Sequence, residues 1–160
     1  MLMKRFPPQT ARIATLLLSA MVIVPVVPAQ LGRPAATVDP TKEILGTWEG
    51  YMADPDGSPH GPIKLEITAD TITASNPRGG QAMGAGTYRI SSSNERLTRI
   101  DGKGTSGQFQ GKSYEGIFAI EGKTLKWCSA NDNPRSKRPT ELKTNLQAGQ
   151  FLMVLEKKQD

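Results

Sequence analysis

The stretch SYEGIFAIEGKTLKWC, residues 113–128, decides the fold class. Its first half alternates between two sets of side chains, and this period of two is typical of a β-strand with one apolar face. The residues EGK at 121–123 indicate a turn, and a second apolar run follows at 124–128. The stretch therefore predicts two antiparallel strands joined by a tight turn. The residues that share one face of the first strand are Tyr114, Gly116, Phe118 and Ile120.

The same pattern continues over the chain from residue 44 onward. Short apolar runs are separated by Gly, Pro, Asn and Asp, and no run has apolar residues at helical spacing. Turn signals recur at about the 8–12 residue spacing of an all-β sandwich or barrel. Periodicity alone does not separate these two architectures. The predicted strands are 47–52, 63–68, 71–76, 86–91, 96–100, 113–120, 124–128 and 151–156, with a weaker one at 141–144.

The first 29 residues have the three-part pattern of a secretory signal peptide. Three basic residues precede an uncharged apolar run at 13–27, and small residues follow up to Ala29. The run is shorter than the roughly 20 residues that a membrane-spanning helix needs. We therefore expect cleavage after Ala29, export to the periplasm or the medium, and no membrane span afterwards. An uncleaved N-terminal membrane anchor is the alternative.

The mature chain then divides into two parts. Residues 30–43 consist largely of small residues and prolines without periodicity, so they are predicted to be a flexible linker, with a turn of helix at 43–45 as a lead-in. The folded domain is predicted to span residues 44–158. Residues 78–86 are rich in glycine, and because no helix pattern follows them they are interpreted as a loop over the barrel mouth rather than a phosphate-binding loop.

The charge balance argues against nucleic acid as a partner. The chain carries 20 basic and 15 acidic residues, a net charge of +5, and three of the basic residues lie in the first 29. Removing that segment leaves 17 basic against 15 acidic residues, or +2, without the basic stripe of a nucleic-acid-binding domain. Arg135, Lys137 and Arg138 form a basic cluster without interleaved aromatic residues. We interpret it as a solvated loop, with Arg138 anchored to a carboxylate such as Glu141.

No residue pattern points to catalysis, a metal or a cofactor. Cys128 is the only cysteine, so it cannot form a disulfide within the chain, and His60, the only histidine, lies between prolines far away in sequence. A nucleophilic cysteine needs a nearby base, so Cys128 is interpreted as a buried strand residue. The residues DPDG at 54–57 lack the later ligands of a calcium loop and are interpreted as a turn.

An ordered set of motifs resembles a known family. The set comprises LGTWE at 45–49, GIFAIEGKTLKWC at 116–128, KRPTEL at 137–142 and FLMVLEKK at 151–158. It is similar to uncharacterised lipocalin-like secreted bacterial domains of the type abundant in planctomycetes, whose members typically follow a signal peptide. The resemblance implies an antiparallel lipocalin-like β-barrel of about eight strands. Fold by itself does not dictate function.

The resemblance also implies a barrel signature of Gly46, Trp48 and Arg138. In lipocalins a late arginine packs across the tryptophan of the first strand, a cation–π contact worth about 0.5–2 kcal/mol. Arg138 is the candidate partner of Trp48 here. Lys157 and Lys158 instead occupy the last strand, where the family pattern places the arginine, so the partner stays open at this point.

These observations favour an exported, non-enzymatic barrel that binds a small apolar ligand or an envelope partner. The alternatives are a packed interaction module without a ligand and, with less support, a hydrolase on a barrel scaffold. An eight-stranded barrel can be filled by its own side chains or leave room for one ligand. The residues predicted to line a cavity are Trp48, Leu65, Ile67, Tyr88, Phe118, Leu125, Trp127 and Met153.

Overall fold

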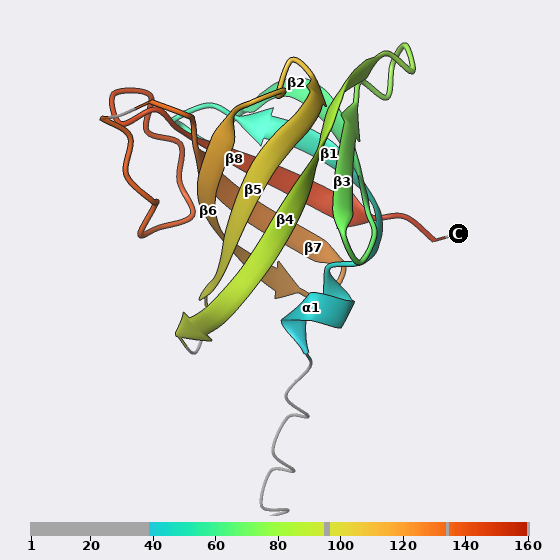
Figure 1. The fold of residues 1–160 in the computed structure, drawn as a ribbon, viewed down its shortest axis with the longest axis horizontal. Coiled ribbons are helices and arrows are strands. Elements are labelled where there is room, and N and C mark those ends of the chain that lie inside the picture. The colour runs from blue at the N-terminus through green and yellow to red at the C-terminus, as the bar shows by residue number, and fades with distance from the viewer. Residues whose placement is uncertain (1–38, 95–96, 134, 160) are drawn as a thin grey trace, which may run out of the picture. The chain divides into compact units, whose positions relative to one another are not determined.

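The fold is a closed barrel of eight antiparallel strands (Figure 1). The structure is a computed structural model that describes residues 39–94, 97–133 and 135–159. Each strand pairs with the next in chain order, and β1 pairs with β8 to close the barrel. The predicted all-β barrel is thereby confirmed. The strands are β1 (Gly46–Ala53), β2 (Pro59–Ile67), β3 (Thr71–Ser75), β4 (Ala82–Asn94), β5 (Leu97–Gly107), β6 (Ser113–Glu121), β7 (Thr124–Ala130) and β8 (Gln150–Lys157).

A short helix, α1 (Pro40–Glu43), precedes the first strand. It takes up the end of the segment 30–43 that was predicted to be a linker, and it begins before the expected helical turn at 43–45, so the prediction is corrected at residues 40–43. Residues 30–38 of that segment lie outside the described residues. Asp39 caps the helix by accepting a hydrogen bond from the Thr41 N–H at 3.0 Å, and Pro40 suits the first helical turn. The predicted signal peptide, residues 1–29, lies outside the described residues. Of the residues described, none belongs to a helix long and apolar enough to cross a membrane.

Two predicted elements differ from the structure. The glycine-rich stretch 78–86 is a loop only in part, because β4 begins at Ala82 and pairs with both β3 and β5. The weak strand predicted at 141–144 does not form, because β7 and β8 pair directly and the closed barrel offers no free edge. The Thr144 hydroxyl instead donates to the Ala53 carbonyl and accepts from the Leu152 N–H, which ties the β7–β8 connection to the barrel.

The two ends of the barrel are built differently. We call closed end the one that carries α1 and the β2–β3, β4–β5 and β6–β7 connections, and open end the one with the four remaining loops. Ile44 follows α1 and is completely buried at the closed end. Trp48 is also completely buried there, and its indole N–H donates to the Ile44 carbonyl at 2.7 Å. The inward side chains of this half form a dense core that includes Ile100, Phe118, Leu125 and Leu155.

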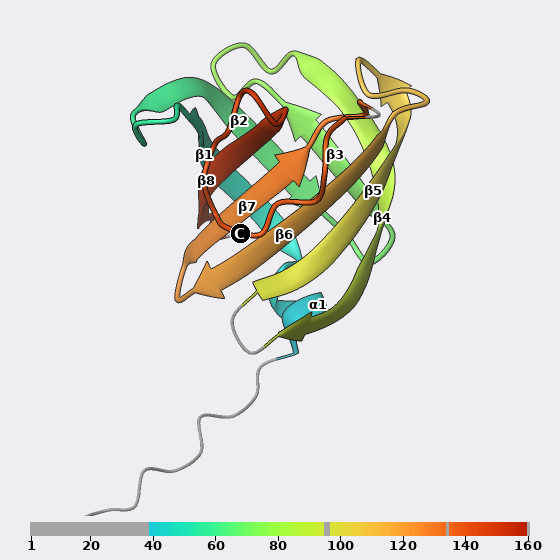
Figure 2. The same cartoon turned by 90° about the vertical axis from the view of Figure 1, so that its left-hand side faces the viewer.

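The long β7–β8 connection, residues 131–149, runs over the outside of β6 and β7 (Figure 2). Beneath it, the outward-facing Ile117 and Cys128 are buried although they do not face the barrel interior. Pro139 of the connection is itself fully buried. The connection therefore forms a second, smaller apolar layer on one side of the barrel.

A candidate ligand cavity at the open end of the barrel

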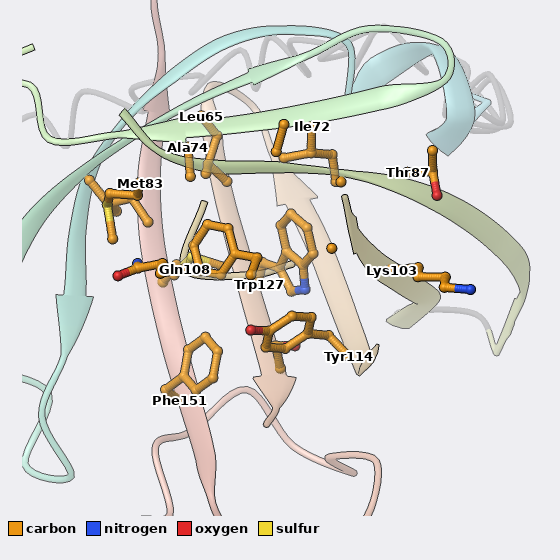
Figure 3. Close-up of a pocket in the computed structure, with 18 of the residues that line it drawn as sticks. Leu65, Ile72, Ala74, Met83, Thr87, Lys103, Gln108, Tyr114, Trp127 and Phe151 are labelled. Atoms are coloured by element: carbon orange, nitrogen blue, oxygen red, sulfur yellow. The ribbon is translucent and has the colours of Figure 1, made fainter. Parts of the chain in front are cut away.

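A cavity of about 200 Å³ occupies the open half of the barrel (Figure 3). Trp127 on β7 and Met153 on β8 stand side by side in the register and contribute part of its wall. Apolar side chains dominate the rest of the wall. They belong to Met52, Ile63, Leu65, Ile72, Ala74, Met83, Phe109 and Phe151.

Three glycines of β4 and β5 form part of the cavity wall, and only Gly102 among them has room for a side chain. The register pairs Gly86 with Gly104, and both residues line the cavity together with Gly102. A Cβ at Gly86 would lie 2.7 Å from the Lys103 carbonyl oxygen, so that glycine also permits close contact between strands. A Cβ at Gly102 would have only two neighbours within 4 Å, the Thr87 carbonyl oxygen at 3.8 Å and the Tyr114 Cβ at 3.9 Å. Gly102 therefore leaves free space that a side chain could fill.

Three of the residues predicted to line a cavity do so, namely Leu65, Trp127 and Met153. The other five lie elsewhere in the interior, so their assignment to the cavity is corrected. The reason is their position along the barrel axis, since alternation identifies an inward side chain but not the half of the barrel that it fills. Trp48, Ile67, Phe118 and Leu125 are buried in the core, and Tyr88 packs against that core.

Gly46 and Trp48 lie at the closed end, and the cation that packs over the Trp48 ring there is a lysine. Lys157 Nζ lies 5.1 Å from the centroid of the Trp48 ring and donates to the Glu43 carbonyl at 2.9 Å. Gly46 has φ of 116°, a backbone conformation that favours glycine. The candidate partner Arg138 is not at this end, which corrects that prediction and leaves Lys157 as the residue over the ring.

Arg138 instead clamps the outer face of β5 and β6. Its Nη2 lies 2.6 Å from Asp101 Oδ1 as an ion pair rather than a well-directed hydrogen bond, and 3.8 Å from Glu115 Oε1. Its Nη1 donates to the Gly116 carbonyl at 2.9 Å. The anchor is thus Asp101 rather than the predicted Glu141. The RPTE segment therefore holds the β7–β8 connection against the barrel wall.

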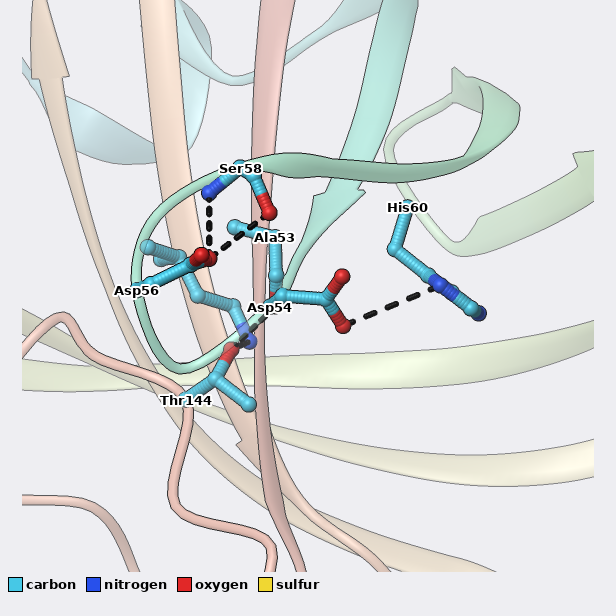
Figure 4. A network of polar contacts seen from close by, with 7 residues as sticks. Ala53, Asp54, Asp56, Ser58, His60 and Thr144 are labelled. Atoms are coloured by element: carbon cyan, nitrogen blue, oxygen red, sulfur yellow. Dashed lines mark hydrogen bonds and ion pairs between the residues drawn. The ribbon is translucent and has the colours of Figure 1, made fainter.

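The single cysteine and the single histidine lie apart from the cavity wall. Cys128 is completely buried under the β7–β8 connection, and its Sγ donates to the Lys143 carbonyl at 3.2 Å. Burial raises the pKa of the Cys128 thiol, which disfavours the reactive thiolate. His60 is exposed at the start of β2, with Nδ1 3.7 Å from Asp54 Oδ1 (Figure 4).

The DPDG segment forms the expected turn between β1 and β2 (Figure 4). Asp56 Oδ1 accepts hydrogen bonds from the Ser58 N–H at 2.9 Å and the Ser58 hydroxyl at 2.7 Å. Gly57 has φ of 87°, as the turn requires. Within the described ranges, no group of three His, Cys, Asp or Glu residues is arranged to hold a metal ion.

Sequence reasoning missed the polar residues of the cavity. Ser129 and Tyr114 line it beside Trp127, and Ser129 is only 3% exposed. A usable signal was present, because Ser129 continues the alternation of Leu125 and Trp127. The spacing of Gly102 and Gly104 by two residues was a second signal.

The geometry therefore describes a barrel with one sealed end and one end that contains an apolar cavity with a few polar groups. Comparisons with protein-family models, with curated proteins and with solved structures give no match to this chain.

Proposed function

We propose that this protein is an exported lipocalin-like barrel that binds a small apolar molecule at its open end without catalysing a reaction. The observation that carries the proposal is the apolar cavity of about 200 Å³ in a barrel whose other half is densely packed. Protein interiors are normally close-packed, so a void of this size is unusual unless it is used. A ligand that buries apolar surface there gains about 25 cal/mol per Å².

The alternatives have less support from the side chains. A packed interaction module would be expected to present a contiguous apolar patch at its surface. Among the described residues, Leu146 is the only large apolar side chain with high exposure, at 69%. A hydrolase would need His60 or Cys128 in a pocket beside a carboxylate, and neither residue lines the cavity.

Native mass spectrometry of the chain purified from an exporting host tests the proposal directly. We expect a mature chain that begins at Gln30 and carries a stoichiometric organic molecule, which extraction would identify. A chain that retains its first 29 residues would contradict the expected cleavage after Ala29 and leave the cavity part to the next test.

Filling the cavity provides a matched test with ethylbenzene as the probe, followed by calorimetry. Gly102→Leu places a side chain in the free space and is expected to abolish binding of ethylbenzene. Gly79→Leu is the control, because a Cβ at Gly79 meets nothing within 4 Å in an exposed turn. Absence of binding to the unmodified chain, or equal binding by the Gly102→Leu variant, would overturn the proposal.

A further inference from the structure

The cavity has one polar corner, formed by residues of β6 and β7. Ser129 pairs with Gly116 in the register, and Tyr114 lies two residues before Gly116, so Tyr114 and Ser129 are diagonal neighbours on the inner face. Trp127 precedes Ser129 on that face and also lines the cavity, as Figure 3 shows together with Tyr114. Three residues of β6 and β7 thus bring polar groups to one side of the cavity, and Gln108 is a further polar residue of its wall.

One of these polar groups is buried without a hydrogen-bond partner among the described residues. The Trp127 indole N–H is buried against Gly116 without a hydrogen bond. Ser129 is nearly completely buried and lines the cavity. A buried polar group without a partner costs about 1–3 kcal/mol. A ligand with a suitably placed acceptor or donor would remove part of this cost.

No cation accompanies the polar corner. Lys103 is the only charged residue among the described residues that line the cavity. It lies between the inward-facing Gly102 and Gly104, so strand alternation directs its side chain outward. Figure 3 shows the Lys103 side chain extending away from Trp127 and Tyr114. A ligand carboxylate in the corner would lose its hydration without gaining a positive charge.

We infer that the cavity selects small apolar molecules that carry one neutral hydrogen-bonding group, such as a ketone or an alcohol, and that Ser129 and Tyr114 bind this group. The inference rests on the proposed function and names its ligand class. The volume of about 200 Å³ suits a single ring with a short substituent. For comparison, an engineered apolar cavity of about 150 Å³ in another protein takes up benzene.

Three probes of nearly equal shape test the inference on the exported chain. They are ethylbenzene, acetophenone and benzoate, and calorimetry measures the affinity of each at neutral pH. We expect ethylbenzene and acetophenone to bind and benzoate to bind at least about 100-fold more weakly than acetophenone, since an unpaired buried charge costs several kcal/mol. Equal affinity for benzoate and acetophenone would overturn the inference.

Two conservative variants assign the hydrogen bonds. Ser129→Ala and Tyr114→Phe should each lower the affinity for acetophenone by about threefold to tenfold, and leave the affinity for ethylbenzene unchanged or higher. Tyr88→Phe is the control, because the Tyr88 hydroxyl donates to the Thr68 carbonyl at 2.7 Å and lies outside the cavity wall. It should leave both affinities unchanged.

The outcomes separate the two proposals. If neither ethylbenzene nor acetophenone binds to the unmodified chain, the proposed function fails and the inference fails with it. If ethylbenzene binds but both variants bind acetophenone as the unmodified chain does, the cavity is a general apolar site. In that case the inference is wrong and the proposed function stands.

Discussion

The closed and open ends of the barrel use the same strands for different purposes. At the closed end, Trp48 is completely buried, and its N–H has a hydrogen-bond partner. At the open end, Trp127 borders a cavity, and its N–H has no partner among the described residues. The difference indicates that the closed end is densely packed, while the open end keeps unfilled space beside the unpaired indole N–H of Trp127. Matched pairs of residues test this difference.

Two phenylalanines provide the largest expected contrast. Phe118 is 1% exposed in the core, whereas Phe151 is half-buried beside the cavity. Phe118→Ala should lower the free energy of unfolding by about 3–5 kcal/mol, because it leaves a void in close-packed surroundings. Phe151→Ala should cost no more than about 2 kcal/mol. Urea denaturation followed by tryptophan fluorescence measures both, and equal losses would contradict the distinction between the two ends.

Two inward-facing glycines offer the next contrast. A Cβ at Gly50 would overlap the backbone carbonyl oxygen of Val154, whereas a Cβ at Gly102 makes only ordinary contacts. Gly50→Ala should therefore destabilise the fold by about 1–3 kcal/mol through overpacking. Gly102→Ala should raise the free energy of unfolding by up to about 1 kcal/mol, since alanine restricts the conformations of the unfolded chain. Thermal denaturation distinguishes them, and a larger loss for Gly102→Ala would break the comparison.

Two adjacent lysines test the seal of the closed end. Lys157→Met removes the cation over Trp48 and the hydrogen bond to Glu43, and should cost about 0.5–2 kcal/mol. Lys158→Met removes only an exposed ion pair with Glu49, whose atoms are 3.0 Å apart, and should cost about 0.5 kcal/mol or less. Chemical denaturation at low and high salt provides the measurement. A loss for Lys158→Met as large as that for Lys157→Met would show that the tryptophan contact adds nothing.

Two tyrosines provide the smallest contrast and a pH dependence. Tyr88→Phe removes the hydrogen bond to Thr68 and should cost about 0.5–1.5 kcal/mol at neutral pH, while Tyr114→Phe should be nearly neutral. Burial raises the pKa of both hydroxyls, with Asp70 adding to the effect at Tyr88 and Asp132 at Tyr114.

The sign of the pH effect follows from these raised pKa values. A raised pKa in the folded state means that stability is fully present below the pKa of the unfolded chain, about 10, and falls as the pH rises above it. As the pH rises above about 10, each Phe variant should therefore lose less stability than the unmodified chain. The difference is the loss that ionisation of the replaced tyrosine causes in the unmodified chain. Denaturation curves at neutral and alkaline pH check this, and an unchanged alkaline loss in both variants would contradict it.

The strands of the barrel could largely be predicted from the sequence because their inner faces are apolar at every second residue. Residues 113–120 and 124–128 alternate clearly, and the structure extends them by only one or two residues. The prediction failed at the start of β4, where residues 82–85 were interpreted as a loop before a strand at 86–91 although they pair with β3 and β5. Local composition could not show that the neighbouring strand β5 approaches so closely that no side chain fits at Gly84 and Gly86.

The candidate site could be predicted only in part. Leu65, Trp127 and Met153 were identified as inward-facing, and the cavity wall contains them. The glycines of the cavity wall (Gly86, Gly102 and Gly104) and the polar corner were not identified, because both depend on which residues of distant strands face one another. Arg138 was only a candidate partner of Trp48, and the β7–β8 connection carries it to Asp101 on the outside of the barrel.

By itself, the sequence determined the fold class and the set of strands, since a period of two in apolar residues favours half-buried strands wherever they are placed. Only the tertiary structure decided that β1 closes on β8, that Lys157 lies over Trp48, and that the empty space lies at the open end. The physical reason is that side-chain direction is a local property of the backbone. The space between side chains, in contrast, depends on contacts between residues far apart in the chain.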